Sequence, residues 1–153
     1  MTPNCCGRIG RVIRSFAFWP ILNEEHTLIM QTTIFIAFAG LAGTLIRYWI
    51  SGFVARQYGE NFPWGTLIVN LIGSFLAGAL YHLAEERLLI SPTLRTVILI
   101  GLIGGFTTFS SYGLQTFTLL RDGQIGLATL NVAVSNVLGL LMVWMGYVVL
   151  KLI

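Results

Sequence analysis

GLIGGFTTFSSYG, residues 101–113, lies at the centre of the third of four long apolar segments and decides how this chain folds. Glycine weakens a helix by about 1 kcal/mol relative to alanine, and clustered threonine and serine compete for its backbone hydrogen bonds. We therefore expect a helix that stops near Gly104 and restarts near Thr108. Irregular backbone at membrane depth is tolerated only where protein buries it or where it lines a watery cavity. This stretch is accordingly the candidate working site.

A helix interrupted in this way has two new ends of opposite polarity. The first half ends in free carbonyl groups, which attract a cation, and the second half begins with free N–H groups, which attract an anion. Phe109 and Tyr112 are three residues apart, on one face of the restarted helix. Their ring edges are weakly positive, so an edge-on aromatic pair can face an anion. The alternative is a helix contact made close by glycines, with the hydroxyls bonded back to the preceding turn.

Composition places the chain in a membrane. Of its 153 residues, 56% are hydrophobic and only 10% are charged, whereas a soluble domain has about 25% charged residues. Four segments are long enough to cross the hydrocarbon core as helices; they span residues 32–55, 64–84, 96–120 and 126–150. The net charge of +3 is spread along the chain, which argues against a nucleic-acid partner. The two cysteines are adjacent, so they give neither a disulfide framework nor a metal site of ordinary spacing.

Residues 1–29 differ from the rest of the chain. They carry Arg8, Arg11 and Arg14, and their apolar run contains Pro20 and is too short to span a bilayer. No small-residue cleavage site follows this run, as a signal peptide would require. We expect an N-terminal extension that is disordered or not translated, with a short interfacial helix as the alternative. Residues 30–153 then form the membrane domain.

Three motifs occur in order along this domain: GLAGTLIRY at 40–48, GTLIVNLIGSF at 65–75 and GGFTTFSSY at 104–112. The last is similar to the GGxTTFSTF signature of the CrcB/Fluc fluoride channels. The second resembles that family's second-helix motif, and the first resembles its first-helix glycine pattern ending in arginine. The resemblance covers about residues 30–153. It implies an all-α membrane protein with four transmembrane helices, the third broken at its centre, arranged as an antiparallel dual-topology homodimer with two pores.

Lys and Arg residues near the segment ends are nearly balanced across the membrane once residues 1–29 are set aside. One side has Arg87, Arg95 and Lys151, and the other has Arg56 and Arg121. Because these residues set the orientation of membrane helices, the chain could insert both ways and form an antiparallel two-fold dimer. The alternative is that the glutamates at 85 and 86, or a partner, settle one orientation.

Two polar side chains inside the segments need partners. Asn70 lies in the middle of the second segment, where its amide either bonds a neighbouring helix or lines an anion path. The resemblance matches it to the family's pore-lining asparagine. Arg47 lies about two turns from the end of the first segment, where a charge is costly. We expect Arg47 to form an electropositive vestibule or a structural anchor rather than to contact the ion directly.

Fluoride is small, strongly hydrated and a strong hydrogen-bond acceptor. A narrow path must replace its water with fixed donors and positive ring edges, and must hold no net charge that traps it. The expected path comprises Asn70, Phe109, Ser110, Ser111 and Tyr112. Ser135 is a further candidate because it forms a polar stripe with Asn131 in the fourth segment; hydrogen bonding between helices is the alternative for that stripe.

Tyr112 departs from the family, which usually has Phe at this position. Its hydroxyl either points into the path as one more donor or bonds a neighbouring helix and leaves the ring edge as the ligand. We favour the second outcome, because Asn70 and Ser110 already offer donors nearby. Ser111 stands where the family has Thr, and it keeps the hydroxyl.

The resemblance also implies a structural sodium ion at the centre of the dimer. Backbone carbonyls at the third-helix break hold this ion in the family, and the matching residues are Gly104 and Thr107.

The predicted function is passive, selective export of fluoride through the cell membrane. A small multidrug transporter also has four helices, but proton coupling there needs a membrane-embedded carboxylate, and the cores of all four segments lack Asp and Glu. A membrane scaffold without transport does not explain Asn70 together with the aromatic pair. An intramembrane enzyme needs a base or a metal cluster, and neither is visible in the sequence.

Overall fold

The computed structural model describes the backbone of residues 6–152 and the side chains of residues 26–152. The chain divides into two units, residues 1–34 and 35–153, and helix α1, Cys6–Tyr58, belongs partly to each. Residues 6–34 are helical, whereas residues 1–5 and the side chains up to residue 25 lie outside the described part. The expectation that residues 1–29 are disordered or not translated therefore stays a prediction.

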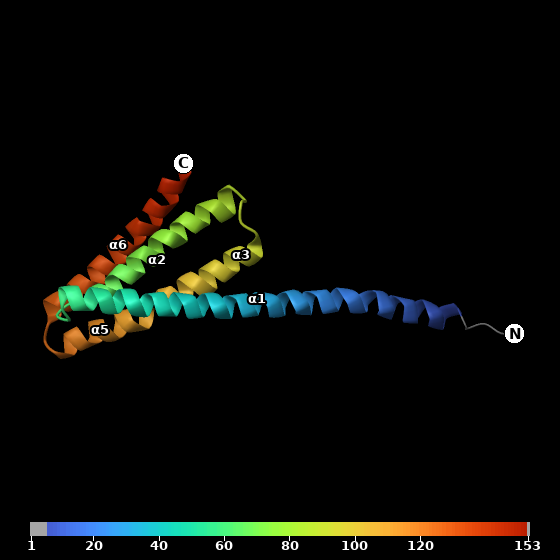
Figure 1. The fold of residues 1–153 in the computed structure, drawn as a ribbon, viewed down its shortest axis with the longest axis horizontal. Helices are drawn as coiled ribbons and strands as arrows, with labels where there is room; N and C mark the ends of the chain where they lie inside the picture. Colours follow the sequence, from blue (N-terminus) through green and yellow to red (C-terminus); the bar gives the residue numbers. More distant parts are fainter. Residues whose placement is uncertain (1–5, 153) are drawn as a thin grey trace. The chain divides into compact units, whose positions relative to one another are not determined.

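Regular structure in the described residues is entirely helical (Figure 1). After α1 come α2 (Trp64–Tyr81) and the π-helical turn η1 (His82–Glu86). The third segment is built from α3 (Pro92–Thr96), the π-helical η2 (Val97–Ile103), α4 (Gly104–Phe106) and α5 (Phe109–Arg121), and α6 (Ile125–Lys151) ends the fold. Among the described residues, four helical stretches are long and apolar enough to cross a membrane: His26–Tyr58, Trp64–Glu86, Pro92–Arg121 and Ile125–Lys151. The predicted four-helix membrane fold is confirmed.

Short polar connections set the ends of these helices. Gly59 and Gly123 adopt φ values of +78° and +75°, a left-handed conformation that glycine enters without steric cost. Ser91 caps α3 by accepting a hydrogen bond from the Leu94 N–H at 3.3 Å, and Pro92 occupies the first helical position, where its missing N–H costs nothing. The connections are therefore tight, which keeps successive helices close together.

Helices α2 and α6 lie side by side because glycines remove the side chains between them (Figure 1). A Cβ on Gly78 would collide with the Val143 carbonyl, and a Cβ on Gly146 would collide with the Phe75 carbonyl. Small residues of this kind allow close backbone approach and good van der Waals packing in a membrane, where no hydrophobic effect drives helices together.

Helix α1 approaches the third segment in the same way. A Cβ on Gly105 would lie 2.6 Å from the Gly40 carbonyl oxygen, and a Cβ on Gly101 would lie 2.9 Å from the Ile36 carbonyl oxygen. A Cβ on Gly43 would collide with the Leu102 carbonyl. The GxxG pattern of the first motif thus holds α1 directly against the residues that precede Thr107.

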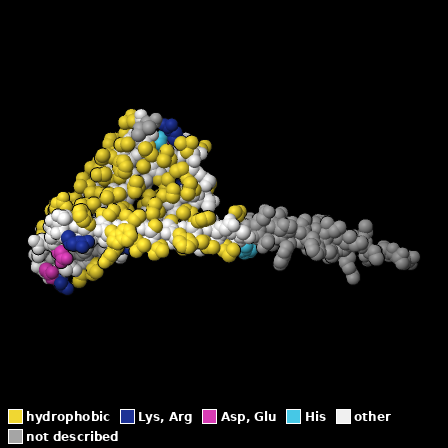
Figure 2. All heavy atoms as spheres, in the orientation of Figure 1, with side chains coloured by type: hydrophobic (Ala, Val, Ile, Leu, Met, Phe, Trp, Pro, Cys, Tyr) yellow, Lys and Arg dark blue, Asp and Glu magenta, His cyan; other side chains and the backbone are white. Residues whose placement is uncertain are grey.

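The surface of this unit is largely apolar, and its buried core is small. Hydrophobic side chains cover most of the face drawn in Figure 2. The buried apolar side chains include Leu67, Val69, Ile103 and Phe106, whereas large side chains such as Phe38 and Trp144 are more than half exposed. Such a surface suits lipid or another membrane helix rather than water.

The α2–α6 contact gives a test of this packing. Gly78→Ala should destabilise the fold by about 1–3 kcal/mol, because the added methyl group meets rigid backbone. Gly126→Ala, at the start of α6 with nothing within 4 Å of its Cβ, is the matched control and should be neutral or slightly stabilising. Thermal unfolding of both variants in detergent measures the difference. Equal stability of the two would contradict the close contact.

Candidate functional site

Two extended residues separate α4 from α5. Thr107 has φ −84° and ψ 162°, and Thr108 has φ −151° and ψ 117°. We expected the first half of the helix to stop near Gly104, but helical backbone continues to Phe106 and resumes at Phe109. Thr107 explains the difference, because its N–H and its hydroxyl both donate to the Ile103 carbonyl at 2.9 Å. These two bonds complete one more turn.

Asn70 of α2 pairs with the backbone of Thr108. The Thr108 N–H donates to Asn70 Oδ1 at 2.9 Å, and Asn70 Nδ2 donates to the Thr108 carbonyl at 3.1 Å. An extended residue turns its N–H and its C=O to the same side, and an amide side chain carries a matching acceptor and donor. Asn70 therefore satisfies both groups at once, as a neighbouring strand would. The structure shows the helix-to-helix bond that was one of the two roles expected for this side chain.

The Thr108 side chain caps α5. The Ser111 N–H donates to Thr108 Oγ1 at 3.2 Å, and Thr108 Oγ1 donates to Ser111 Oγ at 3.0 Å. Ser110 Oγ lies 3.3 Å from Thr108 Oγ1; because the one hydroxyl proton of Thr108 goes to Ser111, Ser110 is the donor in this contact. A cap of this type is worth about 1 kcal/mol and fixes the direction in which the helix restarts. Sequence analysis missed this role, although the Thr-x-x-Ser spacing signals it.

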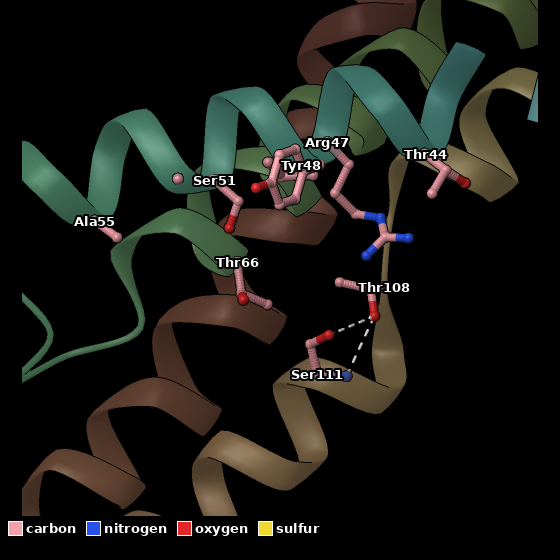
Figure 3. A pocket seen from close by; sticks show the side chains of 10 residues that line it. Thr44, Arg47, Tyr48, Ser51, Ala55, Thr66, Thr108 and Ser111 are labelled. Carbon is pink, nitrogen blue, oxygen red and sulfur yellow. Dashed lines mark hydrogen bonds between the residues drawn. The ribbon is translucent and has the colours of Figure 1, made fainter. Parts of the chain in front are cut away.

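Arg47 and Thr44 of α1 bind the end of α4. Arg47 Nε donates to the Gly105 carbonyl at 3.1 Å, and Thr44 Oγ1 donates to the same oxygen at 3.4 Å. Arg47 is half-buried, and its guanidinium points from α1 toward Thr108 (Figure 3). The cation therefore anchors the helix end by one nitrogen and presents its remaining N–H groups beside the interruption.

Two cavities flank the extended residues. We call the first the Arg47 cavity; it has a volume of about 390 Å³ (Figure 3). Its polar lining comes from Thr44, Arg47, Ser51, Thr66, Thr108 and Ser111. The second, the Asn70 cavity, has a volume of about 340 Å³, and its lining includes Asn70, Gly73, Ser74, Thr107, Thr108 and Phe109. Thr108 lines both cavities, so the interruption lies between them.

The carbonyls of Gly104 and Thr107 lose the donors that a continuous helix would supply. The N–H four residues after Gly104 belongs to Thr108 and bonds Asn70. The N–H four residues after Thr107 belongs to Ser111 and bonds the Thr108 hydroxyl. Neutral carbonyl oxygens are suitable ligands for a hard cation. The donor set at this position therefore fits the cation expected there.

Phe109 and Tyr112 form an aromatic pair at the start of α5. Their ring centroids are 5.5 Å apart and the ring planes are tilted by 49°. Phe109 is 83% exposed, the highest value among the large hydrophobic side chains described. The described residues of the chain therefore leave this ring open beside the polar interruption.

The polar stripe of α6 is bonded to α5. Asn131 is 1% exposed, and its Nδ2 donates to Thr116 Oγ1 at 2.8 Å. Ser135 Oγ donates to Asn131 Oδ1 at 3.4 Å, and Asn136 Nδ2 donates to the Tyr112 hydroxyl at 3.3 Å. Asn131 and Asn136 thus make the interhelical bonds that were the alternative for the stripe, whereas Ser135 bonds Asn131 within α6. Ser135 lines neither the Arg47 cavity nor the Asn70 cavity.

Comparisons with known proteins identify the family of this chain. A family model described as "CrcB-like protein, Camphor Resistance (CrcB)" matches residues 34–147. The "Fluoride-specific ion channel FluC" of Opitutus terrae is 49% identical over 121 residues, which cover 78% of this chain and 92% of that protein. Proteins of the same name from Citrifermentans bemidjiense and Rhodospirillum rubrum are 46% and 44% identical over 122 and 120 residues. These matches cover 80% and 77% of this chain, and 98% and 93% of the two relatives.

The resemblance drawn from the three motifs is therefore confirmed, and this chain, a multi-pass membrane protein, belongs to the CrcB family.

Proposed function

We propose that this protein is a passive, fluoride-selective channel that lets fluoride leave the cell. The observation that carries the proposal is the pair of cavities, each partly lined by polar side chains, that meet at Thr108 within a membrane-spanning segment. Relatives named as fluoride-specific ion channels, which are 44–49% identical to this chain over most of its length, support the same function. The protein is a channel rather than an enzyme.

The chemistry of the Arg47 and Asn70 cavities suits a strongly hydrated anion. Ser111 Oγ accepts from Thr108, and its own proton has no acceptor among the described residues. Asn70 Nδ2 bonds Thr108 with one N–H, and its second N–H has no acceptor in the same part of the chain. Arg47 adds a positive charge whose Nε is already bound to a carbonyl. These groups replace water around fluoride without placing a free carboxylate nearby.

The proposed path joins the donors to the aromatic pair. Its residues are Asn70, Phe109, Ser110, Ser111, Tyr112 and Ser135. Ring edges of Phe109 and Tyr112 would face the anion, while Arg47 serves as vestibule and anchor together. The driving force would be the membrane potential, about 2.3 kcal/mol per 100 mV for one charge. Fluoride that enters the cell as the neutral weak acid would leave by this route.

The working unit that we propose is an antiparallel homodimer of chains with opposite orientations. The nearly balanced Lys and Arg residues at the ends of residues 30–153 support it, as does the open Phe109 ring. A structural sodium ion would be held by the carbonyls of Gly104 and Thr107 from both protomers. The ion would link the two broken helices, which are otherwise left with unpaired carbonyls at membrane depth.

A proton-coupled multidrug transporter is the alternative function, and a membrane scaffold without transport is another. The absence of Asp and Glu from the cores of the four segments argues against the first. The bonded break, with a cavity on each side of it, argues against the second.

Fluoride efflux tests the function. Purified protein in liposomes loaded with potassium fluoride should release fluoride on addition of a potassium ionophore, because the anion then follows potassium. A fluoride electrode records the release, and liposomes without protein are the control. The same liposomes loaded with chloride should retain it. Equal loss of the two halides would contradict selectivity, and proton-driven uptake of a cationic drug would favour the transporter.

Asn70 variants test the path. Asn70→Asp keeps the acceptor for the Thr108 N–H but sets a carboxylate oxygen against the Thr108 carbonyl and an anionic charge against the Asn70 cavity. Fluoride flux should fall about a hundredfold, since an unpaired buried polar group and a like charge each cost more than about 1 kcal/mol. Asn70→Ser keeps a donor, so its fluoride flux should fall less than that of Asn70→Asp. Asn61→Asp, in the exposed α1–α2 connection, is the control and should conduct normally. Parent-like flux in both Asn70 variants would make this side chain a packing residue.

Cysteine labelling at the C-terminus tests the orientation. A chain that starts at Met30 should be labelled from both sides of the membrane. The full chain adds Arg8, Arg11 and Arg14 to the side of the C-terminus, which brings the Lys and Arg count to six on that side against two on the other. One orientation should then be more populated than the other. A single orientation in the shortened chain would contradict the antiparallel dimer.

A further inference from the structure

Several hydrogen-bond donors expected on the anion path are already committed within the chain. Ser110 donates to Thr108, and one N–H of Asn70 does the same. Ser135 donates to Asn131. Our preference for Tyr112 as a ring edge alone rested on free donors at Asn70 and Ser110; in the structure Ser110 is committed and Asn70 keeps one free N–H.

Tyr112 differs from these groups because its oxygen is the acceptor. Asn136 Nδ2 donates to the phenol oxygen at 3.3 Å, so the phenol keeps its own proton. That proton has no acceptor among the described residues. The two roles that we distinguished for this hydroxyl are therefore compatible: it bonds a neighbouring helix and it still carries a donor.

We propose that the Tyr112 hydroxyl donates a hydrogen bond to the permeating anion and that Asn136 is the positioning residue that aims it. The proposal rests on the proposed fluoride channel and adds to it a donor that a phenylalanine at this position lacks. Within the described part of the chain, Asn136 hydrogen-bonds only the tyrosine and its own helix, so it would act through Tyr112.

The surrounding contacts hold the phenol in place. Asn136 Nδ2 also donates to the Val132 carbonyl at 2.7 Å, which fixes the amide on α6. Thr116 Oγ1 donates to the Tyr112 carbonyl at 2.8 Å and accepts from Asn131, which ties the same turn of α5 to α6. A tyrosine bonded at its hydroxyl and at its backbone carbonyl loses little freedom when it binds an ion, and such preorganisation favours binding.

The amide also strengthens the phenol as a donor. An N–H bonded to the phenol oxygen withdraws electron density from it, and hydrogen bonds in a chain polarise one another in this way. The Phe109 ring, 5.5 Å away, makes the neighbourhood apolar, which increases the electrostatic attraction between a donor and an anion. Fluoride, as a strong acceptor, is the halide that gains most from such a donor.

Efflux from liposomes gives the first test. Tyr112→Phe should lower fluoride flux about tenfold, the effect of one lost hydrogen bond to a charged group. Asn136→Leu keeps the Tyr112 hydroxyl but removes the bond that orients it. Its fluoride flux should therefore fall less than that of Tyr112→Phe. The double variant should be no slower than Tyr112→Phe, because Asn136 acts through the phenol. Tyr147→Phe is the matched control: its hydroxyl bonds Glu86 at 2.6 Å, at the opposite end of α6 from Ile125, and its flux should equal that of the parent.

Tyrosine absorbance distinguishes a Tyr112 hydroxyl that donates to the anion from one that only packs α5 against α6. Fluoride should shift the tyrosine absorbance of the solubilised parent and of Tyr147→Phe, and should leave Tyr112→Phe unchanged. A slower Tyr112→Phe without any fluoride-dependent shift in the parent would mean a packing role and would overturn the proposal. Parent-like flux in Tyr112→Phe would overturn it while leaving the channel intact. If the parent releases no fluoride, the proposed function fails, and the absorbance shift still decides whether Tyr112 binds the anion.

Discussion

The two hydrogen bonds between the Asn70 amide and the Thr108 backbone are the contacts on which the rest of the site depends. An unpaired N–H or C=O in hydrocarbon costs several kcal/mol, so a helix at membrane depth resists interruption. Asn70 removes that cost for Thr108, because it bonds both the N–H and the C=O of that residue. Because the Thr108 N–H turns to α2, the Gly104 carbonyl is left without its helical donor, and the Thr108 hydroxyl becomes free to start α5. The freed carbonyl, the capped helix and the two cavities thus have one cause.

Glycine packing brings the required groups within reach. Arg47 can bind the Gly105 carbonyl because Gly40 and Gly43 let α1 approach the backbone of the third segment. Gly73 has the same role on α2, where any Cβ would collide with the Thr107 methyl group. A larger side chain at one of these positions would displace the helix that carries Arg47 or Asn70. The small residues of the three motifs therefore position the polar ones, which explains why both kinds occur together.

Sequence analysis predicted the fold better than the individual bonds of the site. The four spans follow from apolar length, and the site follows from glycines and hydroxyls at membrane depth. The end of the first half-helix was placed two residues early, because the double bond from Thr107 to Ile103 depends on a rotamer that composition does not specify. The partner of Asn70 lies 38 residues away, and periodicity gives no information on such a contact. The direction of the Asn136–Tyr112 bond was equally inaccessible, since a hydroxyl can donate or accept.

The central claim is that the bonded interruption passes fluoride and rejects chloride. The zero-current potential of a planar bilayer that contains the protein tests it most directly, with fluoride concentrated on one side and chloride on the other. The two gradients drive potentials of opposite sign, so the sign alone identifies the permeating ion. A fluoride-selective protein should give a potential close to the equilibrium potential of fluoride. A potential near zero, or one with the sign set by chloride, would contradict it.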